Sequence, residues 1–243
     1  IEMMESAYSA DQIKEFVQGL DVDYDNTVAF PDFDEHNIRH NIPFNPKEPL
    51  ILTCDFNFNP MCWYLVQYYN DTWYILDELI ENNITTQEMC RVAQVAIDRY
   101  GVRDFKIMGD AHGKDRKTNG SDYATMVIYF NRRGYTVTPQ IQSANPPIKE
   151  RLAVLRGIIR NAKGERRLYV NDRCKRLLFN FEECRNHLSN GGLKIPTDND
   201  IQKRDELRYL IHPIDAISYP MWCFNGLNAI KRDKQEYNNK NQK

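Results

Sequence analysis

The stretch 50–80 constrains the fold more than any other part of the sequence. Leu50–Phe56 is a short apolar run, and it is followed by the aromatic-rich runs Met61–Tyr69 and Thr72–Ile80, which are joined by a tight Asn-Asp connection. Runs of this length and composition predict β-strands, and the short polar connection predicts a hairpin. The stretch therefore predicts three consecutive antiparallel strands.

Helices and further strands alternate after this meander. Thr85 and Glu88 form a T-x-x-E capping box that begins a helix, and Gly101 ends it. The remaining pattern predicts strands at 105–109, 135–138 and 167–170, and helices at 121–133, 148–160, 175–188 and from Asp215, where Pro220 should bend or break the helix. The order β-β-β-α-β-α-β-α predicts an α/β fold with a mixed sheet and helices on both faces.

The segments on either side of this core have a different character. Residues 1–48 show little periodicity apart from one helix expected at Ala10–Val17, and the first residue is Ile1. The last residues are polar and charged, as in flexible tails. We therefore expect an irregular lead-in at 1–48, one domain at 49–228 and a flexible tail at 229–243.

Composition excludes several classes of protein. Hydrophobic residues make up 42% and charged residues 27%, which is typical of a globular chain, and no apolar run reaches the length of a membrane span. The six cysteines form no C-x-x-C pair, which favours free thiols in a reducing intracellular setting. The net charge of −2 gives no overall signal for nucleic acid.

Carboxylates stand at the ends of two predicted strands. Asp55 ends the first strand and Asp110 ends the fourth, where a turn containing His112 follows. If these strands pair in parallel, the two carboxylates lie roughly 4.8 Å apart. They would then repel each other unless they share a proton or a divalent ion, and oxygen ligands suit magnesium or manganese.

Asp215 is the third candidate ligand, although it could equally be a helix cap. His212, three residues earlier, favours the functional reading because it could assist a metal-bound water or touch a phosphate. Three such carboxylates are the equipment for two-metal phosphodiester cleavage, with ions roughly 3.5–4 Å apart.

Asp77, Glu78 and His112 are secondary candidates. The first two end the third strand, about 10 Å from Asp55, where an exposed strand-end pair is the simpler reading.

A basic stretch is a candidate surface for DNA. Residues 147–176 contain ten basic and three acidic side chains. The predicted phosphate contacts are Lys149, Arg151, Arg156, Arg160, Arg166 and Arg167. The alternative is the solvated face of a helix whose Leu152, Leu155 and Ile159 point inward. No base-reading helix is evident, so we expect weak, salt-dependent binding with little sequence preference.

The segments 53–57, 109–113 and 212–219 resemble the acidic motifs of the large terminase subunit, the DNA-packaging motor of tailed bacteriophages. The resemblance covers about residues 20–225 and is to the C-terminal nuclease domain. It implies an RNase H-like fold in which Asp55, Asp110 and Asp215 hold two Mg²⁺ or Mn²⁺ ions, with His212 as an auxiliary residue. Phe56-Asn57 departs from the pattern, because many relatives carry a glycine after the first Asp.

The same resemblance implies a function and partners. It predicts an endonuclease that cuts double-stranded concatemeric viral DNA during packaging, in the host cytoplasm. Its partners would be an ATPase domain of the same polypeptide, the portal protein and the small terminase subunit; no G-x-x-x-x-G-K-[ST] motif occurs here. A junction resolvase or transposase-like nuclease, and a catalytically silent RNase H-like docking module, are the alternatives.

Overall fold

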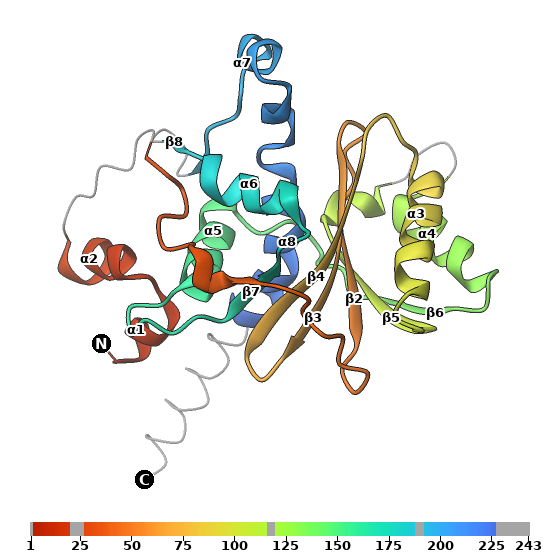
Figure 1. The fold of residues 1–243 in the computed structure, drawn as a ribbon, viewed down its shortest axis with the longest axis horizontal. Helices are drawn as coiled ribbons and strands as arrows, with labels where there is room; N and C mark the ends of the chain where they lie inside the picture. Colours follow the sequence, from red (N-terminus) through yellow and green to blue (C-terminus); the bar gives the residue numbers. More distant parts are fainter. Residues whose placement is uncertain (1, 20–26, 116–119, 188–191, 227–243) are drawn as a thin grey trace.

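A single twisted sheet with helices on both faces forms the body of the molecule (Figure 1). The computed structural model describes residues 2–19, 27–115, 120–187 and 192–226. The sheet has seven strands in the order β1-β7-β4-β3-β2-β5-β6. Their bounds are β1 (Ile38–Arg39), β2 (Leu50–Asp55), β3 (Met61–Tyr69), β4 (Thr72–Glu81), β5 (Asp104–Gly109), β6 (Thr136–Pro139) and β7 (Leu168–Asn171).

The predicted meander is confirmed. β3 pairs antiparallel with β2 and with β4, whereas all other pairs in this sheet are parallel. Every residue of β2 is buried, because this strand lies inside the sheet and is covered on both faces. A continuous apolar run such as Leu50–Cys54 suits that position.

Two hydrophobic cores lie on opposite faces of the sheet. α3 (Thr86–Asp98) and α4 (Asp122–Asn131) cover one face, where residues such as Met89 and Met126 meet Leu52 of β2. α5 (Ile148–Ile159), α6 (Lys175–Glu183) and α8 (His212–Met221) cover the other, where Leu155 and Ile217 join the core. The two-sided α/β architecture agrees with the prediction.

The N-terminal segment is more ordered than the sequence suggested. The helix expected at Ala10–Val17 is present as α2 (Ala10–Gln18), and the segment also contributes α1 (Glu2–Ala7), a single 3₁₀ turn η1 (Glu35–Asn37) and β1. β1 pairs in parallel with β7, and the buried Asn37 side chain donates to the carbonyl oxygens of Ile159 (3.1 Å) and Leu168 (2.9 Å). A two-residue strand carries no periodic pattern, so the sequence could not reveal it.

The C-terminal part departs from the prediction in its details. α6 ends five residues earlier than expected and is followed by the β8 (Asn186–His187) and β9 (Gly192–Leu193) pair, α7 (Asp198–Lys203) and η3 (Asp205–Tyr209). α8 begins at His212 and places Pro213 in its first turn, where the missing N–H costs nothing. Pro220 does not break the helix, which continues into the turn η4 (Trp222–Gly226). The expected tail at 229–243 lies outside the described residues.

The helices in the described part of the chain are too short or too polar to cross a lipid bilayer.

Gly109 allows β5 to end against β2. Its φ is 141°, and a Cβ atom there would lie 2.1 Å from the carbonyl oxygen of Cys54. We expect Gly109→Ala to lower the free energy of unfolding by more than about 4 kcal/mol, because both the backbone and its neighbour would have to move. Gly101→Ala is the control: its φ is also positive but the space around it is open, so the cost should be about 1 kcal/mol. Urea denaturation of both variants measures the difference, and equal costs would contradict the close approach.

Candidate active site

Two carboxylates meet at the carboxyl end of β2 and β5. The strands pair in parallel with Cys54 opposite Gly109, and the N–H of Asp110 donates to the carbonyl oxygen of Cys54 at 3.0 Å. Asp55 and Asp110 are therefore the next residues along the two neighbouring strands. The parallel pairing that the sequence argument required is confirmed.

α8 carries the third carboxylate to the same edge. Thr53 Oγ1, two residues before Asp55 and on the same face of β2, donates to the carbonyl oxygen of Ala216 at 2.5 Å. The N–H of Asp215 donates to the carbonyl oxygen of Ile211 at 2.8 Å, so Asp215 lies within the first turn of the helix. Ile211 precedes the helix with a φ of 85°, a strained value for a β-branched residue. The reading of Asp215 as a helix cap is therefore wrong.

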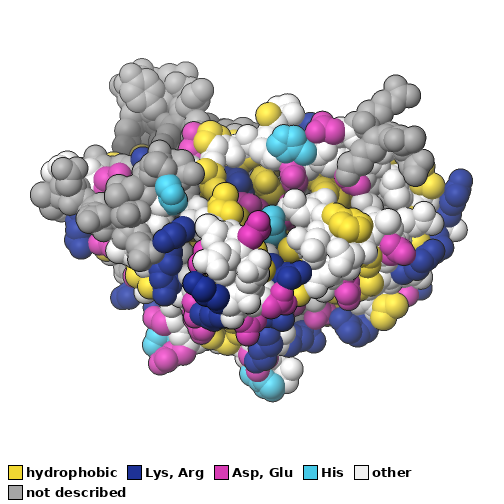
Figure 2. Space-filling view, turned by 90° about the horizontal axis from the view of Figure 1, so that it is seen from above, with side chains coloured by type: hydrophobic (Ala, Val, Ile, Leu, Met, Phe, Trp, Pro, Cys, Tyr) yellow, Lys and Arg dark blue, Asp and Glu magenta, His cyan; other side chains and the backbone are white. Residues whose placement is uncertain are grey.

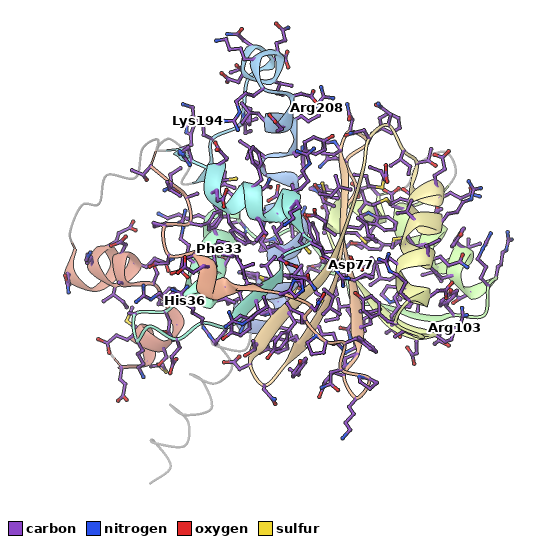
Figure 3. The ribbon with its side chains drawn as sticks, viewed as in Figure 1. Phe33, His36, Asp77, Arg103, Lys194 and Arg208 are labelled. Carbon is purple, nitrogen blue, oxygen red and sulfur yellow. The ribbon has the colours of Figure 1, made fainter. Side chains whose placement is uncertain are left out.

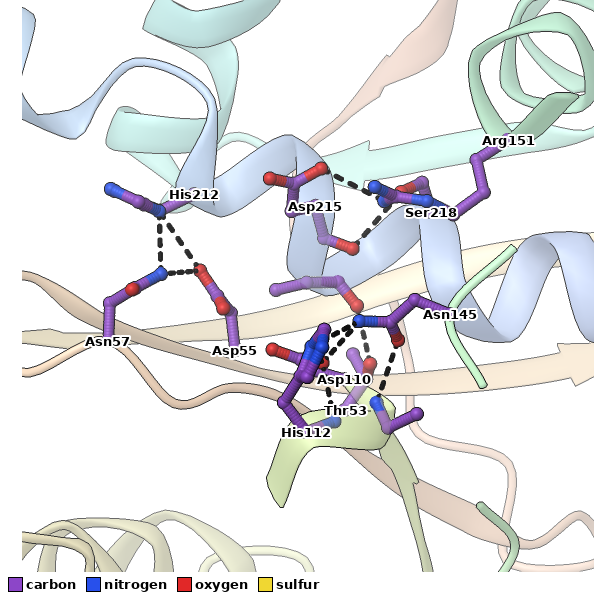
Figure 4. Close-up of polar contacts among 12 residues, drawn as sticks. Thr53, Asp55, Asn57, Asp110, His112, Asn145, Arg151, His212, Asp215 and Ser218 are labelled. Carbon is purple, nitrogen blue, oxygen red and sulfur yellow. Dashed lines mark hydrogen bonds and ion pairs between the residues drawn. The ribbon is translucent and has the colours of Figure 1, made fainter. Parts of the chain in front are cut away.

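Asp55 is held by an asparagine and a histidine (Figure 4). Its Oδ2 accepts a hydrogen bond from Asn57 Nδ2 at 2.7 Å and lies 3.1 Å from His212 Nδ1. Asn57 Nδ2 lies 2.8 Å from the same ring nitrogen of His212. The side chain of Asp55 is 5% exposed, so these polar partners offset its burial.

Asp110 has a matching set of partners. Its Oδ1 accepts from Asn145 Nδ2 at 2.5 Å, accepts from the N–H of His112 at 2.8 Å and lies 3.0 Å from His112 Nδ1. Asn145 Oδ1 also accepts from the N–H of Ala111, which fixes the loop before α5 against the turn after β5. The structure thus places His112, a secondary candidate, next to Asp110.

Asp215 differs because its partner is charged. Arg151 Nη1 donates to Asp215 Oδ1 at 2.9 Å and to Ser218 Oγ at 2.5 Å, and its guanidinium lies 4.2 Å from the centre of the Tyr219 ring. Arg151 is 5% exposed. The expectation that it contacts DNA is wrong, since it lies inside the fold and neutralises a carboxylate of the site.

Each of the three carboxylates keeps one oxygen without a hydrogen-bond donor from the described residues. These oxygens are Asp55 Oδ1, Asp110 Oδ2 and Asp215 Oδ2, whereas the other oxygen of each group is bonded as above. No three His, Cys, Asp or Glu side chains within the described ranges are already gathered as a metal cage. The site therefore has the ligand atoms for a hard cation, on side chains that would still have to turn toward it.

The surroundings shift the pKa values of two of these groups. Burial raises the pKa of Asp215, as does the charge of Asp55, and these effects outweigh the opposing charge of Arg151. Burial lowers the pKa of His212, but the hydrogen bond and charge of Asp55, together with Asp215, hold it above its usual value. Asp55 is thus the main group that stabilises the charged form of His212.

The secondary candidates on β4 serve other contacts. Asp77, labelled in Figure 3, forms ion pairs with Arg99 (2.7 Å) and Arg173 (3.2 Å). Glu78 accepts from the backbone N–H groups of Arg176 and Leu177 in the first turn of α6. Both carboxylates therefore bind the protein on a strand separated from β2 by β3.

Most of the predicted DNA-binding arginines also bind the protein itself. Arg156 donates to the carbonyl oxygen of Ala29, Arg166 pairs with Asp34 at 2.5 Å and Arg167 pairs with Asp71 at 3.0 Å. Only Lys149 and Arg160 of the six are exposed. Figure 2, which is seen from above the view of Figure 1, shows basic and acidic side chains interspersed among the described residues of this face.

Sequence reasoning missed Asn57, Asn145 and Arg151 as members of this site. Asn145 comes from a loop without pattern, and Arg151 is 64 residues from its carboxylate partner. Only Asn57 could have been found from the sequence. It belongs to the Phe56-Asn57 pair that stands after Asp55, where many terminases have a glycine.

Removing Arg151 tests its pairing with Asp215. We expect Arg151→Met to lower the free energy of unfolding by about 3–5 kcal/mol, because a buried carboxylate loses its counter-charge. In an Asp215→Asn background the same change should cost much less, and urea denaturation of the four proteins measures the coupling. Equal costs in both backgrounds would show that Arg151 acts only through packing.

The protonation of His212 should depend on Asp55. In metal-free buffer, Asp55→Asn is expected to lower the pKa of His212, because the imidazolium loses a hydrogen bond and a negative charge. The stability that this pair contributes is present below the unfolded pKa of about 6.5 and is lost as pH rises through the folded value. NMR titration of the imidazole signals measures both proteins; an unchanged or raised His212 pKa would refute the pairing.

Comparisons with known proteins bear on the fold. No family model and no curated protein matches this sequence. The large terminase of a thermophilic bacteriophage, solved with ATP-gamma-S, matches 91% of this chain with a TM-score of 0.61 and 17% identity, and the match covers 51% of that protein. The nuclease domain of the P22 large terminase matches 79% of this chain with a TM-score of 0.51 and 14% identity, and the match covers 96% of that domain.

The chain thus spans about half the length of the thermophilic phage protein and nearly all of the P22 domain. Within the sheet, β2, β3 and β4 form the antiparallel meander that the sequence predicted, and β5 pairs in parallel with β2. The fold of this chain is that of the large-terminase nuclease domain, an RNase H-like sheet covered by helices on both faces.

Proposed function

We propose that this chain is a metal-dependent endonuclease that cuts double-stranded DNA during packaging of a viral genome. The observation that carries the proposal is the convergence of Asp55, Asp110 and Asp215 from three separate elements, each with one oxygen left for a cation. Three structural carboxylates with no further role would be expected to use both oxygens in protein contacts.

The donor set suits Mg²⁺ or Mn²⁺, which prefer oxygen ligands. A small turn of each carboxylate about its side-chain bonds would aim its free oxygen toward a common point. Two bound ions would supply an activated water and neutralise the leaving oxygen. The protein's own part is to hold the carboxylates in register through the β2–β5 pairing and the bond from Thr53 to α8.

His212 is placed to assist without being a ligand. Its Nδ1 faces Asp55 Oδ2, so the ring is oriented by the carboxylate and Nε2 remains for a water or a phosphate oxygen. His112, which is far more exposed, holds the equivalent position beside Asp110. We assign both imidazoles contacts to the substrate backbone.

DNA would approach the carboxyl end of the sheet, where the acidic edge requires a cation before phosphate can bind. Lys149 is exposed in the first turn of α5, the helix that supplies Arg151, so we assign it a contact with phosphate. Backbone contacts of this kind carry no sequence information, which fits cleavage with little sequence preference.

The wider setting follows from the terminase fold. The match covers only about half of the large terminase solved with ATP-gamma-S, so we propose an ATPase domain in the same polypeptide as this chain. The portal protein, the small terminase subunit and action on concatemeric DNA in the host cytoplasm complete this proposal. The free oxygens at the site favour an active nuclease over a silent docking module.

Asp55→Asn, Asp110→Asn and Asp215→Asn are each expected to abolish plasmid cleavage, because a neutral amide cannot hold a divalent ion against its hydration. Glu78→Gln is the control: it removes a half-buried carboxylate two strands away and should retain most of the activity. Circular dichroism establishes that all four variants are folded. A dead Glu78→Gln variant with an intact fold would move the site away from the proposed position.

Cleavage is expected with magnesium or manganese and not with calcium. Calcium accepts looser geometry and more ligands, so it can occupy the site without positioning the reacting oxygens. Plasmid nicking assays with each ion measure this, and full activity in excess EDTA would refute the mechanism. His212→Ala should slow cleavage while leaving manganese affinity nearly unchanged.

A further inference from the structure

A cavity of about 640 Å³ opens beside the site, between the loop after β2 and the helices α3 and α4. Its walls include Phe56, Phe58, Ile128, Tyr129, Arg132 and Arg133. The volume is within the range of about 300–1,000 Å³ that is usual for ligand pockets. None of the three carboxylates of the site lines this space.

The cavity nevertheless shares a wall with the carboxylate site. Phe56 directly follows Asp55, and its ring packs edge-on against Tyr123 with 4.8 Å between ring centres. The Tyr123 hydroxyl donates to the carbonyl oxygen of Asp110 at 2.9 Å. Phe58 is three residues from Asp55, a separation of at most about 10 Å along the chain. A polymer bound at the carboxylates would therefore have to extend only about 10 Å to reach Phe58.

Apolar surface is exposed at this position. Phe58 is 58% exposed and Ile128 is 51% exposed, and both line the cavity. Water contact with this surface is unfavourable, so an apolar or aromatic occupant would be stabilised there.

Two arginines, Arg132 and Arg133, line the cavity, against one carboxylate, that of the buried Asp122. Arg133 lies over the Tyr129 ring at 3.7 Å and donates to the Tyr129 carbonyl oxygen at 3.1 Å. Within the described residues, neither Arg132 nor Arg133 forms an ion pair with a carboxylate. Aromatic faces beside arginines are the combination that binds single-stranded nucleic acid, because bases stack on the rings and phosphates meet the guanidinium groups.

Charge and shape together select the occupant. Paired bases stack on one another inside the duplex, so only an unpaired base can offer its face to Phe58. An acidic or neutral peptide could also meet the arginines, but it has no reason to lie next to a phosphodiester site.

We propose that this cavity binds an unpaired nucleotide of the DNA strand adjacent to the scissile phosphate. The proposal rests on the proposed nuclease function and deepens it. It implies that the protein binds a frayed or newly cut strand end with higher affinity than an intact duplex.

The test compares DNA binding by the full 243-residue chain and its variants in EDTA, where cleavage is prevented. Fluorescence anisotropy is measured with a short single strand, the same strand with abasic sites, and the blunt duplex. Phe58→Ala should weaken binding of the single strand by about five- to a hundredfold, the range expected for one lost stacking contact. Binding of the abasic strand and the duplex should change by less than about twofold, and Phe58→Trp should retain the wild-type affinity for the single strand.

Val95→Ala is the matched control, because Val95 is an exposed apolar residue of α3 that does not line the cavity. It should leave all three affinities unchanged. Equal losses on single, abasic and duplex DNA, or no loss at all, would overturn the proposal; in the latter case a protein segment would be the occupant to test next.

The two proposals fail separately. If wild-type protein cleaves plasmid with magnesium while Phe58→Ala binds single strands normally, only the cavity assignment falls. If wild-type protein fails to cleave with magnesium or manganese, the proposed function falls, and a Phe58-dependent preference for single strands would then describe a binding domain.

Discussion

Repulsion between two neighbouring carboxylates is the constraint on which the rest of this structure depends. Parallel pairing of β2 with β5 places Asp55 and Asp110 next to each other at a partly buried edge. Each carboxylate has one oxygen bound by an asparagine amide and approached by a histidine ring. The asparagine amides are neutral, so they hold the two carboxylates without cancelling their charge, and the strand ends remain attractive to a cation.

The third carboxylate is treated differently because it belongs to a helix. Asp215 is the one member of the set with a full counter-charge, supplied from the neighbouring helix α5 by Arg151. This pairing lets α8 pack its apolar residues, such as Ile214 and Ile217, into the core while its first turn carries an acid. Arg151 therefore offsets the cost of burying Asp215 on a helix that packs in the core.

The local sequence pattern predicted the strands and helices that hold the three carboxylates. Several of the side chains that contact these carboxylates come from distant parts of the chain and could not be predicted from that pattern. β2 to β5 are visible as apolar runs, and two of the three acids stand where those runs end. The partners could not be predicted in the same way: Arg151 looks like any basic residue of a helix, and Asn145 stands in an irregular loop. Their roles depend on side chains that meet only after folding.

The basic stretch shows the same limit. Ten basic residues in thirty suggested a DNA surface, yet Arg166 and Arg167 bind Asp34 and Asp71 from distant parts of the chain. These basic residues form ion pairs within the protein, because the N-terminal segment and the β3–β4 hairpin supply the carboxylates. Sequence charge alone cannot distinguish these two outcomes.

The pairing of β1 with β7 has a consequence for the order of assembly. Ile38 lies opposite Val170, so β1 can join the sheet only after the residues of β7, about 130 positions later, have been synthesised. Until then β4 lacks its neighbour, and an unpaired edge of this kind is prone to wrong association. Asp215 is synthesised later still, and its helix α8 is bound to β2 by the hydrogen bond from Thr53 to the carbonyl oxygen of Ala216. During synthesis the three carboxylates therefore cannot come together until the residues up to Asp215 have been made and α8 has packed against β2.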